Sequence, residues 1–165
     1  RSAMGRDRVG EFERRERNLP HWEAPGETYA VRFSVRKRVP VDLTRADIAP
    51  NIIDALRFQD GKRYLLYDYT VMPDHVHAIL KPMADEGRSE RLAEVLGDAK
   101  KWMARRINAA LGRRGSLWRD ESFDRMIRNE PEYEEWSQYI LDNPRVVGLI
   151  DDALDWPWWG RGSGT

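Results

Sequence analysis

The chain has 165 residues and equal numbers of basic and acidic side chains, 28 each, so its formal net charge is zero. A neutral chain is not expected to bind nucleic acid by bulk charge, because nonspecific affinity for a polyanion comes from many basic residues. Cysteine is absent, which excludes disulfides, thiolate metal sites and a cysteine nucleophile. No apolar run is long enough to span a bilayer and the start has no apolar signal core, so we expect a cytoplasmic protein.

The first half of the chain predicts one strand, one helix and a hairpin. Alternation of apolar and polar residues predicts a strand at residues 29–36. A turn and helix are expected between residues 43 and 60. Aromatic and β-branched residues then predict strands at residues 63–72 and 75–81, which pair as a hairpin around the turn at Pro73-Asp74.

The second half predicts two helices and a short strand. A long amphipathic helix is expected to begin at a Ser89 cap and to end at Gly112–Gly115. A short strand at residues 122–128 is followed by a last helix, capped by Asn129 and ended at Asn143-Pro144. The order β-α-β-β-α-(β)-α predicts an α+β fold, an antiparallel sheet with the helices gathered on one face.

The domain organisation is expected to be simple. Residues 1–18 are charged and nearly featureless, which predicts a flexible arm. Residues 19–159 form a single domain, because no composition shift or internal repeat divides them. Residues 160–165 are rich in glycine and serine, and we predict a disordered tail.

Two of the three histidines, His75 and His77, lie at positions i and i+2 of a predicted strand. Their side chains leave the same face, with backbones roughly 7 Å apart, and can converge on one divalent metal ion. A solvated histidine pair on a sheet face is the alternative. Two imidazoles under-fill a coordination shell, so oxygen ligands must come from elsewhere, which favours Mg²⁺ or Mn²⁺ over structural zinc.

The last predicted helix places Tyr133, Trp136 and Ile140 on one stripe, the expected core face. Tyr139 and Asn143 are i, i+4 neighbours at the edge of that face, so they project together. A phenol beside an amide suits a nucleophile with an adjacent metal ligand. The alternatives are that Tyr139 only packs at a boundary, or that Tyr133 is the nucleophile instead.

A basic stretch is the candidate for DNA contact, and a solvated helix face is its alternative. Trp118 could stack on unpaired bases. The predicted DNA-contact residues are Lys100, Lys101, Arg105, Arg106, Arg113, Arg114, Trp118 and Arg119.

Residues 69–80, which contain the His75-Val76-His77 triplet, closely resemble the metal-site segment of the HUH single-strand nucleases, where U is a hydrophobic residue. Further segments resemble the REP-associated tyrosine transposases of that superfamily, and the resemblance runs from about residue 19 to 159. These segments are residues 19–22, 117–124, 127–130, 139–144 and 147–150. The chain departs from the family at Ser122, where many relatives have an aromatic residue, and at Arg119-Asp120-Glu121, where they have a glutamine-containing segment.

The resemblance implies a ferredoxin-like α+β fold, the HUH nuclease fold. By position, His75 and His77 match metal ligands for Mg²⁺ or Mn²⁺, Tyr139 matches the nucleophile and Asn143 matches a polar metal ligand. The partner implied is single-stranded or hairpin DNA of the REP type, and the location is the bacterial cytoplasm at the nucleoid. Relatives include monomers and homodimers, and the residues do not decide between them.

The resemblance also implies an activity: metal-dependent cleavage of single-stranded DNA near a hairpin, through a 5′-phosphotyrosine intermediate that permits rejoining. One alternative is a catalytically inactive nucleic-acid-binding domain on the same fold. A second is a replication-initiator nuclease, which shares the histidine pair but usually belongs to a larger chain that contains a helicase.

Overall fold

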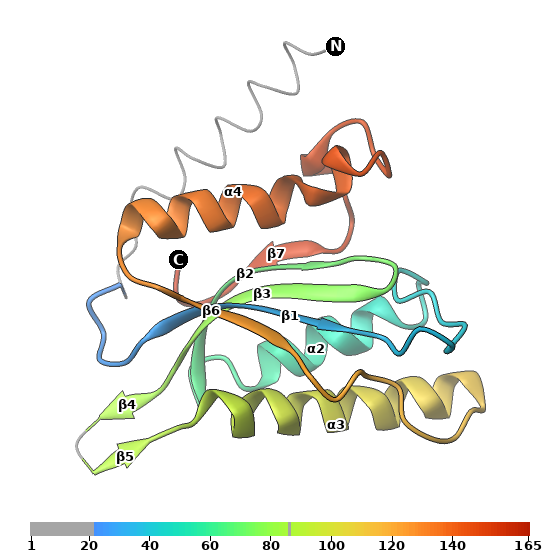
Figure 1. Ribbon diagram of the computed structural model, residues 1–165, viewed down its shortest axis with the longest axis horizontal. Coiled ribbons are helices and arrows are strands. Elements are labelled where there is room, and N and C mark those ends of the chain that lie inside the picture. Colours follow the sequence, from blue (N-terminus) through green and yellow to red (C-terminus); the bar gives the residue numbers. More distant parts are fainter. Residues whose placement is uncertain (1–21, 86) are drawn as a thin grey trace.

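The computed structural model describes residues 22–85 and 87–165 (Figure 1). The predicted arm at residues 1–18 lies outside the described residues. No helix in the described ranges has both the length and the apolar character to cross a membrane. The elements in chain order are β1 (Thr28–Ser34), α2 (Ala49–Phe58), β2 (Tyr64–Val71), β3 (His75–Pro82), β4 (Ala84–Asp85), β5 (Arg88–Ser89), α3 (Leu92–Leu111), β6 (Phe123–Ile127), α4 (Glu130–Val146), the 3-10 helix η1 (Ala153–Asp155) and β7 (Trp159–Arg161).

A five-stranded antiparallel sheet forms the centre of the molecule, with the strand order β6-β1-β3-β2-β7. The predicted hairpin is confirmed, because β2 and β3 pair across the turn at Pro73-Asp74. The predicted α+β class with an antiparallel sheet is also confirmed. A separate two-stranded ribbon, β4-β5, extends beyond the end of β3 (Figure 1).

The helices cover both faces of the sheet, so the prediction that they gather on one face is wrong. α2 and α3 lie on one face over a large apolar core, and α4 lies on the other over a smaller one (Figure 1). The reason is that the central strands carry apolar side chains on both faces of the sheet. On β3, Ala78 packs in the core under α2 and α3, whereas its neighbour Ile79 packs in the core under α4.

A β-bulge in β2 determines what lies beneath α4. Leu66 pairs with Leu80 and Tyr69 pairs with Ala78, so two residues of β2 stand opposite the single residue Ile79. The two bulge residues, Tyr67 and Asp68, both face α4, because Tyr67 belongs to the core under that helix and Asp68 contacts it by a hydrogen bond. The bulge therefore adds a buried carboxylate to the face that carries the histidine pair.

The helix ends agree with the sequence in part. Gly112 follows α3 with a φ of 60°, a left-handed conformation that glycine adopts without strain. Ser89 is not the cap of α3, because the helix begins after Arg91 and has no side-chain cap. Asn129 caps α4 as predicted, accepting a hydrogen bond from the Glu132 amide at 2.9 Å.

The predicted end of α4 at Asn143-Pro144 is wrong, since the helix continues to Val146 with Pro144 inside it. Proline removes one amide donor from a helix and tends to end it. The last turn is nevertheless closed by the amide of Val147, which donates to the Asn143 carbonyl at 3.0 Å, and by that of Leu149, which donates to the Pro144 carbonyl at 2.9 Å.

The glycine-rich end is ordered, so the prediction of a disordered tail at residues 160–165 is wrong. β7 pairs with the outer edge of β2, and the Gly162 and Gly164 amides both donate to β2 carbonyls at 2.8 Å. A Cβ on Gly160 would lie 2.2 Å from the Tyr69 hydroxyl, and one on Gly162 would lie 2.7 Å from the Leu66 carbonyl. These glycines allow close approach to β2, whereas the sequence interpretation took them as signs of flexibility.

Candidate active site

The histidine pair lies on β3, a central strand, and faces α4. The ring centroids of His75 and His77 are 4.9 Å apart. Val76 between them is fully buried on the opposite face, as predicted. His77 is only 5% exposed, and burial, with the nearby His75 and Arg32, lowers its pKa to about 3. This imidazole is therefore neutral at physiological pH, the form that binds a metal ion.

His75 has a carboxylate partner that the sequence interpretation assigned only to a turn. Its Nδ1 lies 2.7 Å from Asp74 Oδ1. Burial lowers the pKa of His75, while the hydrogen bond with Asp74 opposes that shift. A proton on Nδ1 that is donated to Asp74 leaves Nε2 as the acceptor, which is how an outer carboxylate fixes the tautomer of a metal-binding histidine.

Tyr139 and Asn143 of α4 lie against the histidine pair, together as their spacing predicts. Tyr139 is 57% exposed, and its ring centroid is 5.8 Å from that of His77. Asn143 is 8% exposed, and its Nδ2 is 3.2 Å from His77 Nε2. Tyr133, the alternative nucleophile, is fully buried, and its hydroxyl donates a hydrogen bond to Asp68. The geometry thus favours Tyr139, whose phenol is accessible.

The buried carboxylate of Asp68 connects α4 to the sheet. Asp68 is fully buried, accepts the Tyr133 hydroxyl and lies 3.1 Å from Arg161 Nε of β7. Burial raises the pKa of Asp68, whereas Arg161, Tyr133 and Ser137 lower it. One carboxylate therefore ties together the helix that carries Tyr139, the bulge of β2 and the edge strand.

Thr70 is a further buried polar residue at the site. It is the direct antiparallel partner of His77, so both side chains emerge on the same face. Thr70 is fully buried, and within the described part of the chain its Oγ1 has no hydrogen-bond partner. Buried hydroxyls are normally paired, so an unpaired one beside an imidazole indicates a place for a polar ligand.

A pocket of about 440 Å³ opens beside Tyr139. Arg32 on β1 stands opposite both His77 on β3 and Phe123 on β6, which brings these three side chains together across the sheet. The sequence interpretation did not select Arg32 or Phe123, because their closeness to His77 depends on strand order and register. The lining residues are Arg32, His77, Phe123, Glu135, Trp136 and Tyr139.

Comparison with known proteins agrees with this fold. No protein-family model matches the chain. The REP-associated tyrosine transposase of Escherichia coli (strain K12) is 28% identical over 90 residues, which make up 54% of this chain and 49% of that protein. A solved structure of a REP-associated tyrosine transposase bound to a REP hairpin has a TM-score of 0.61 and 22% identity, over 81% of this chain and 76% of that one. The predicted resemblance is confirmed.

These similarities establish different things. The chain spans about half the length of the curated relative it matches, 49%. The solved structure shows that the α+β fold is that of a tyrosine transposase. The roles of individual residues rest on the geometry of the site.

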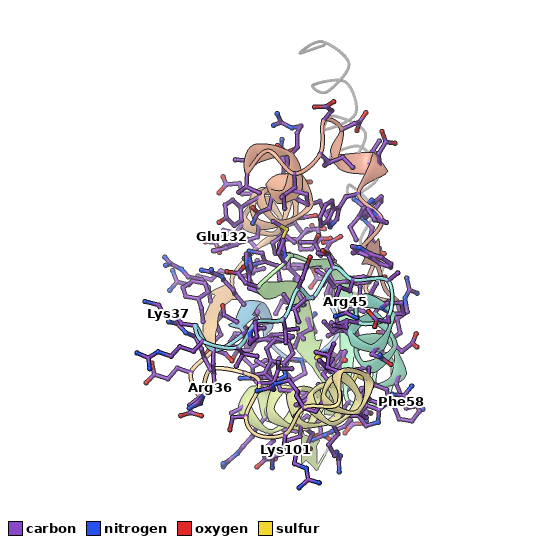
Figure 2. All side chains as sticks on the ribbon, turned by 90° about the vertical axis from the view of Figure 1, so that its right-hand side faces the viewer. Arg36, Lys37, Arg45, Phe58, Lys101 and Glu132 are labelled. Carbon is purple, nitrogen blue, oxygen red and sulfur yellow. The ribbon has the colours of Figure 1, made fainter. Side chains whose placement is uncertain are left out.

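A wider, basic groove of about 880 Å³ adjoins the pocket and shares Arg32 and Phe123 with it. Figure 2 shows Arg36 and Lys37 projecting from the same side of the molecule, after β1. An exposed ion pair joins Arg36 to Asp120 at 3.6 Å. The charged residues that line the groove are Arg32, Arg36, Lys37, Arg119, Asp120 and Glu121.

Most of the predicted DNA-contact residues lie away from this groove, and only Arg119 among them lines it. The predicted contact residues on α3 lie on the face of the sheet opposite the histidine pair. Figure 2 shows one of them, Lys101, at the end of the molecule opposite α4. Lys100 has a structural role, because its Nζ donates to the Arg119 carbonyl at 3.1 Å and to Ser122 Oγ at 3.0 Å.

The prediction that Trp118 stacks on bases is wrong. Trp118 is only 6% exposed, and its ring packs edge-on against Phe33 with centroids 4.9 Å apart. Its Nε1 donates to the Lys100 carbonyl at 3.0 Å. Trp118 is therefore a core residue between β1 and α3. Because it lies in a loop with no periodic pattern, the sequence did not predict its burial.

The site offers two imidazoles and an amide as possible ligands of a divalent cation. Among the described residues, no three histidine, cysteine, aspartate or glutamate side chains gather to hold a metal. The two imidazoles and the Asn143 amide instead lie together, and the unpaired Thr70 hydroxyl belongs to the strand partner of His77. Such a set would leave coordination positions for further oxygen ligands, and Mg²⁺ sites usually include water or phosphate oxygens.

Proposed function

We propose that this protein is a transposase-type endonuclease that cleaves single-stranded DNA beside a hairpin, with Tyr139 as its nucleophile. The observation that carries the proposal is the exposed Tyr139 phenol, placed against the buried His77 and its Asn143 neighbour. The similarity to a transposase and to a hairpin-bound transposase structure supports DNA of the same kind as the substrate.

In the proposed step, the Tyr139 Oη attacks the scissile phosphorus and the bond from phosphorus to the 3′ oxygen breaks. The products are a 5′-phosphotyrosine and a free 3′-hydroxyl. The phenol proton leaves to solvent or a nearby acceptor, and the departing 3′ oxygen takes up a proton. A 3′-hydroxyl that later attacks the phosphotyrosine rejoins the strand without an external energy source.

His75, His77 and Asn143 would hold Mg²⁺ or Mn²⁺, and Thr70 supplies a further oxygen beside them. A divalent ion held there would polarise the scissile phosphate and stabilise the charge that develops on it. The lowered pKa of each histidine keeps its lone pair available for this role at neutral pH.

Arg32 is the cation best placed to orient the substrate. It lines both the pocket beside Tyr139 and the basic groove, so one guanidinium can donate to phosphate oxygens where the strand passes between them. Tyr139 reaches the same space from α4 and has the solvent access that an attacking phenol needs.

The test is the capture of a covalent adduct. A hairpin with a single-stranded flank, labelled at its 3′ end, is incubated with Mg²⁺ or Mn²⁺ and analysed on a denaturing gel. A 5′-phosphotyrosine leaves the label on the protein. We expect an adduct with the wild type, none with Tyr139→Phe, and a rate lower by about 10³-fold or more with His77→Ala.

Tyr29→Phe is the matched control, because Tyr29 packs with the core on the face away from α4 and should not affect the reaction. An adduct formed by Tyr139→Phe would refute the assignment of the nucleophile. Binding of hairpin DNA with no adduct on several hairpins would instead favour a catalytically inactive binding domain.

A further inference from the structure

The pocket beside Tyr139 is lined by aromatic rings that the catalytic step leaves unused. Phe123 is 49% exposed, and its ring centroid is 6.3 Å from that of Trp136. Trp136 in turn lies 5.9 Å from Tyr139, with the two planes nearly perpendicular. The rings thus form a continuous wall from β6 to the nucleophile. The volume of about 440 Å³ is in the range of pockets that take small planar ligands.

An unpaired nucleobase is the ligand that suits this wall in a protein that cleaves single-stranded DNA. Bases stack on aromatic side chains irrespective of their identity, so the wall supplies affinity without discrimination. The pocket also includes His77 and Tyr139, so a base held there belongs to a nucleotide next to the attacked phosphate. Arg32 lines both the pocket and the basic groove, so it can hold the DNA backbone where the strand passes from one to the other.

Glu135 is the unexpected member of the lining. Glu135 and Tyr139 are i, i+4 neighbours on α4, so they project from the same side of the helix. A carboxylate repels the phosphate backbone, and it can only accept hydrogen bonds. It is therefore suited to the donor edge of a base. Guanine offers two adjacent donors, N1–H and the N2 amino group, which match the two carboxylate oxygens, whereas the other bases offer a single donor group there.

We propose that this pocket binds an unpaired guanine next to the scissile phosphate, stacked on Trp136 and Phe123 and selected by Glu135. The inference rests on the proposed function for the position of the phosphate, but guanine selection is measurable by binding alone. Good bidentate base contacts discriminate by about 1–3 kcal/mol, which corresponds to a preference of about 5- to 150-fold.

The experiment measures the affinity of the full chain, by fluorescence anisotropy, for short labelled thymine oligonucleotides that differ only in the central base. The central base is guanine, adenine, cytosine, thymine or hypoxanthine, and the Tyr139→Phe background prevents cleavage. We expect guanine to bind about 10-fold more tightly than the other natural bases. Hypoxanthine, which lacks the N2 amino group, should be intermediate.

Three variants assign the residues. Glu135→Gln should abolish the preference for guanine, because an amide presents one donor and one acceptor. Trp136→Leu should weaken the binding of all bases about 5-fold or more while the preference remains, since stacking is not selective. Glu134→Gln is the matched control, with the same charge change on the same helix outside the pocket, and it should bind like the parent protein.

Equal affinity for all central bases in the parent protein, or an unchanged guanine preference in Glu135→Gln, would overturn the inference. The covalent-adduct assay is run in parallel with the active chain. Adduct formation without guanine selection refutes the pocket assignment alone. Guanine selection without any adduct refutes the nuclease proposal and leaves the base pocket standing.

Discussion

The two faces of the sheet bury very different side chains. The face under α2 and α3 is filled with aliphatic and aromatic residues such as Phe33, Leu66 and Met103. Eight buried polar or charged side chains are found among residues 22–85 and 87–165, and all of them lie on α4 or on the strand face beneath it. They are Thr28, Asp68, Thr70, His77, Lys81, Ser137, Asp142 and Asn143.

The two faces therefore stabilise the fold in different ways. Burying apolar surface stabilises the fold, whereas a buried polar group stabilises it little when paired and costs about 1–3 kcal/mol when unpaired. The apolar face therefore stabilises the fold by burial alone, whereas the polar groups of the α4 face stabilise it only where they are paired, and they include residues of the proposed site. Each of the following predictions tests this difference.

The largest effect is expected at Asp68. Replacing it by alanine removes the acceptor shared by Tyr133 and Arg161 in a fully buried position, and should lower the free energy of unfolding by about 4 kcal/mol. Urea denaturation measures this loss. Asp142→Ala, whose partner Arg145 lies on the same helix, is the control and should lose clearly less. A small loss at Asp68 would mean that α4 is held by its apolar contacts alone.

On the opposite face, Met103→Ala should lower the free energy of unfolding by about 3 kcal/mol, because Met103 is fully buried and leaves a cavity. Adduct formation per folded molecule should not change, since α3 lies across the sheet from Tyr139. Denaturation curves and the adduct assay at low temperature measure the two quantities. Slower adduct formation by fully folded Met103→Ala would show that the faces are coupled.

Mn²⁺ should stabilise the wild type but not His77→Ala. A ligand present at 100 times its dissociation constant raises the free energy of unfolding by about 2.7 kcal/mol when it binds only the folded state. Thermal unfolding with and without Mn²⁺ measures this increase. Tyr139→Phe should retain it, because the phenol is not among the proposed donors. An equal increase in His77→Ala would place the ion elsewhere.

The smallest effect has the opposite sign. Thr70→Val replaces an unpaired buried hydroxyl by a methyl group of similar shape, and should raise the metal-free free energy of unfolding by about 1 kcal/mol. The same variant should bind Mn²⁺ more weakly in calorimetric titrations, whereas Thr70→Ser should resemble the wild type. A less stable Thr70→Val would show that the hydroxyl is paired in solution.

Local patterns in the sequence predicted most of the elements and which candidate site residues project together. Period-two alternation predicts that His75 and His77 share one face of a strand. The i, i+4 spacing predicts that Tyr139 and Asn143 project together from a helix. Both relations lie within one element, so no knowledge of packing is required. The family resemblance then joined the two pairs, and the structure places them in contact.

Relations between elements were beyond those patterns. Arg32 belongs to the site only because β1 pairs with β3, and the unpaired state of Thr70 depends on what α4 leaves open above it. The basic residues of α3 were chosen by charge density, but the side of the sheet on which a helix packs is decided by the apolar residues of every strand together. The ordered tail depends likewise on close contact with β2.

The bulge at Tyr67 and Asp68 also bears on how this chain can vary. In a regular strand, deleting one residue turns every later side chain to the other face. Here the pairs Leu66–Leu80 and Tyr69–Ala78 flank a surplus residue, so a chain that loses Tyr67 or Asp68 can keep both pairs. Thr70 would still stand beside His77. The register on both sides of the bulge would thus survive a one-residue deletion, but the deletion would remove the contacts that Tyr67 or Asp68 makes with α4.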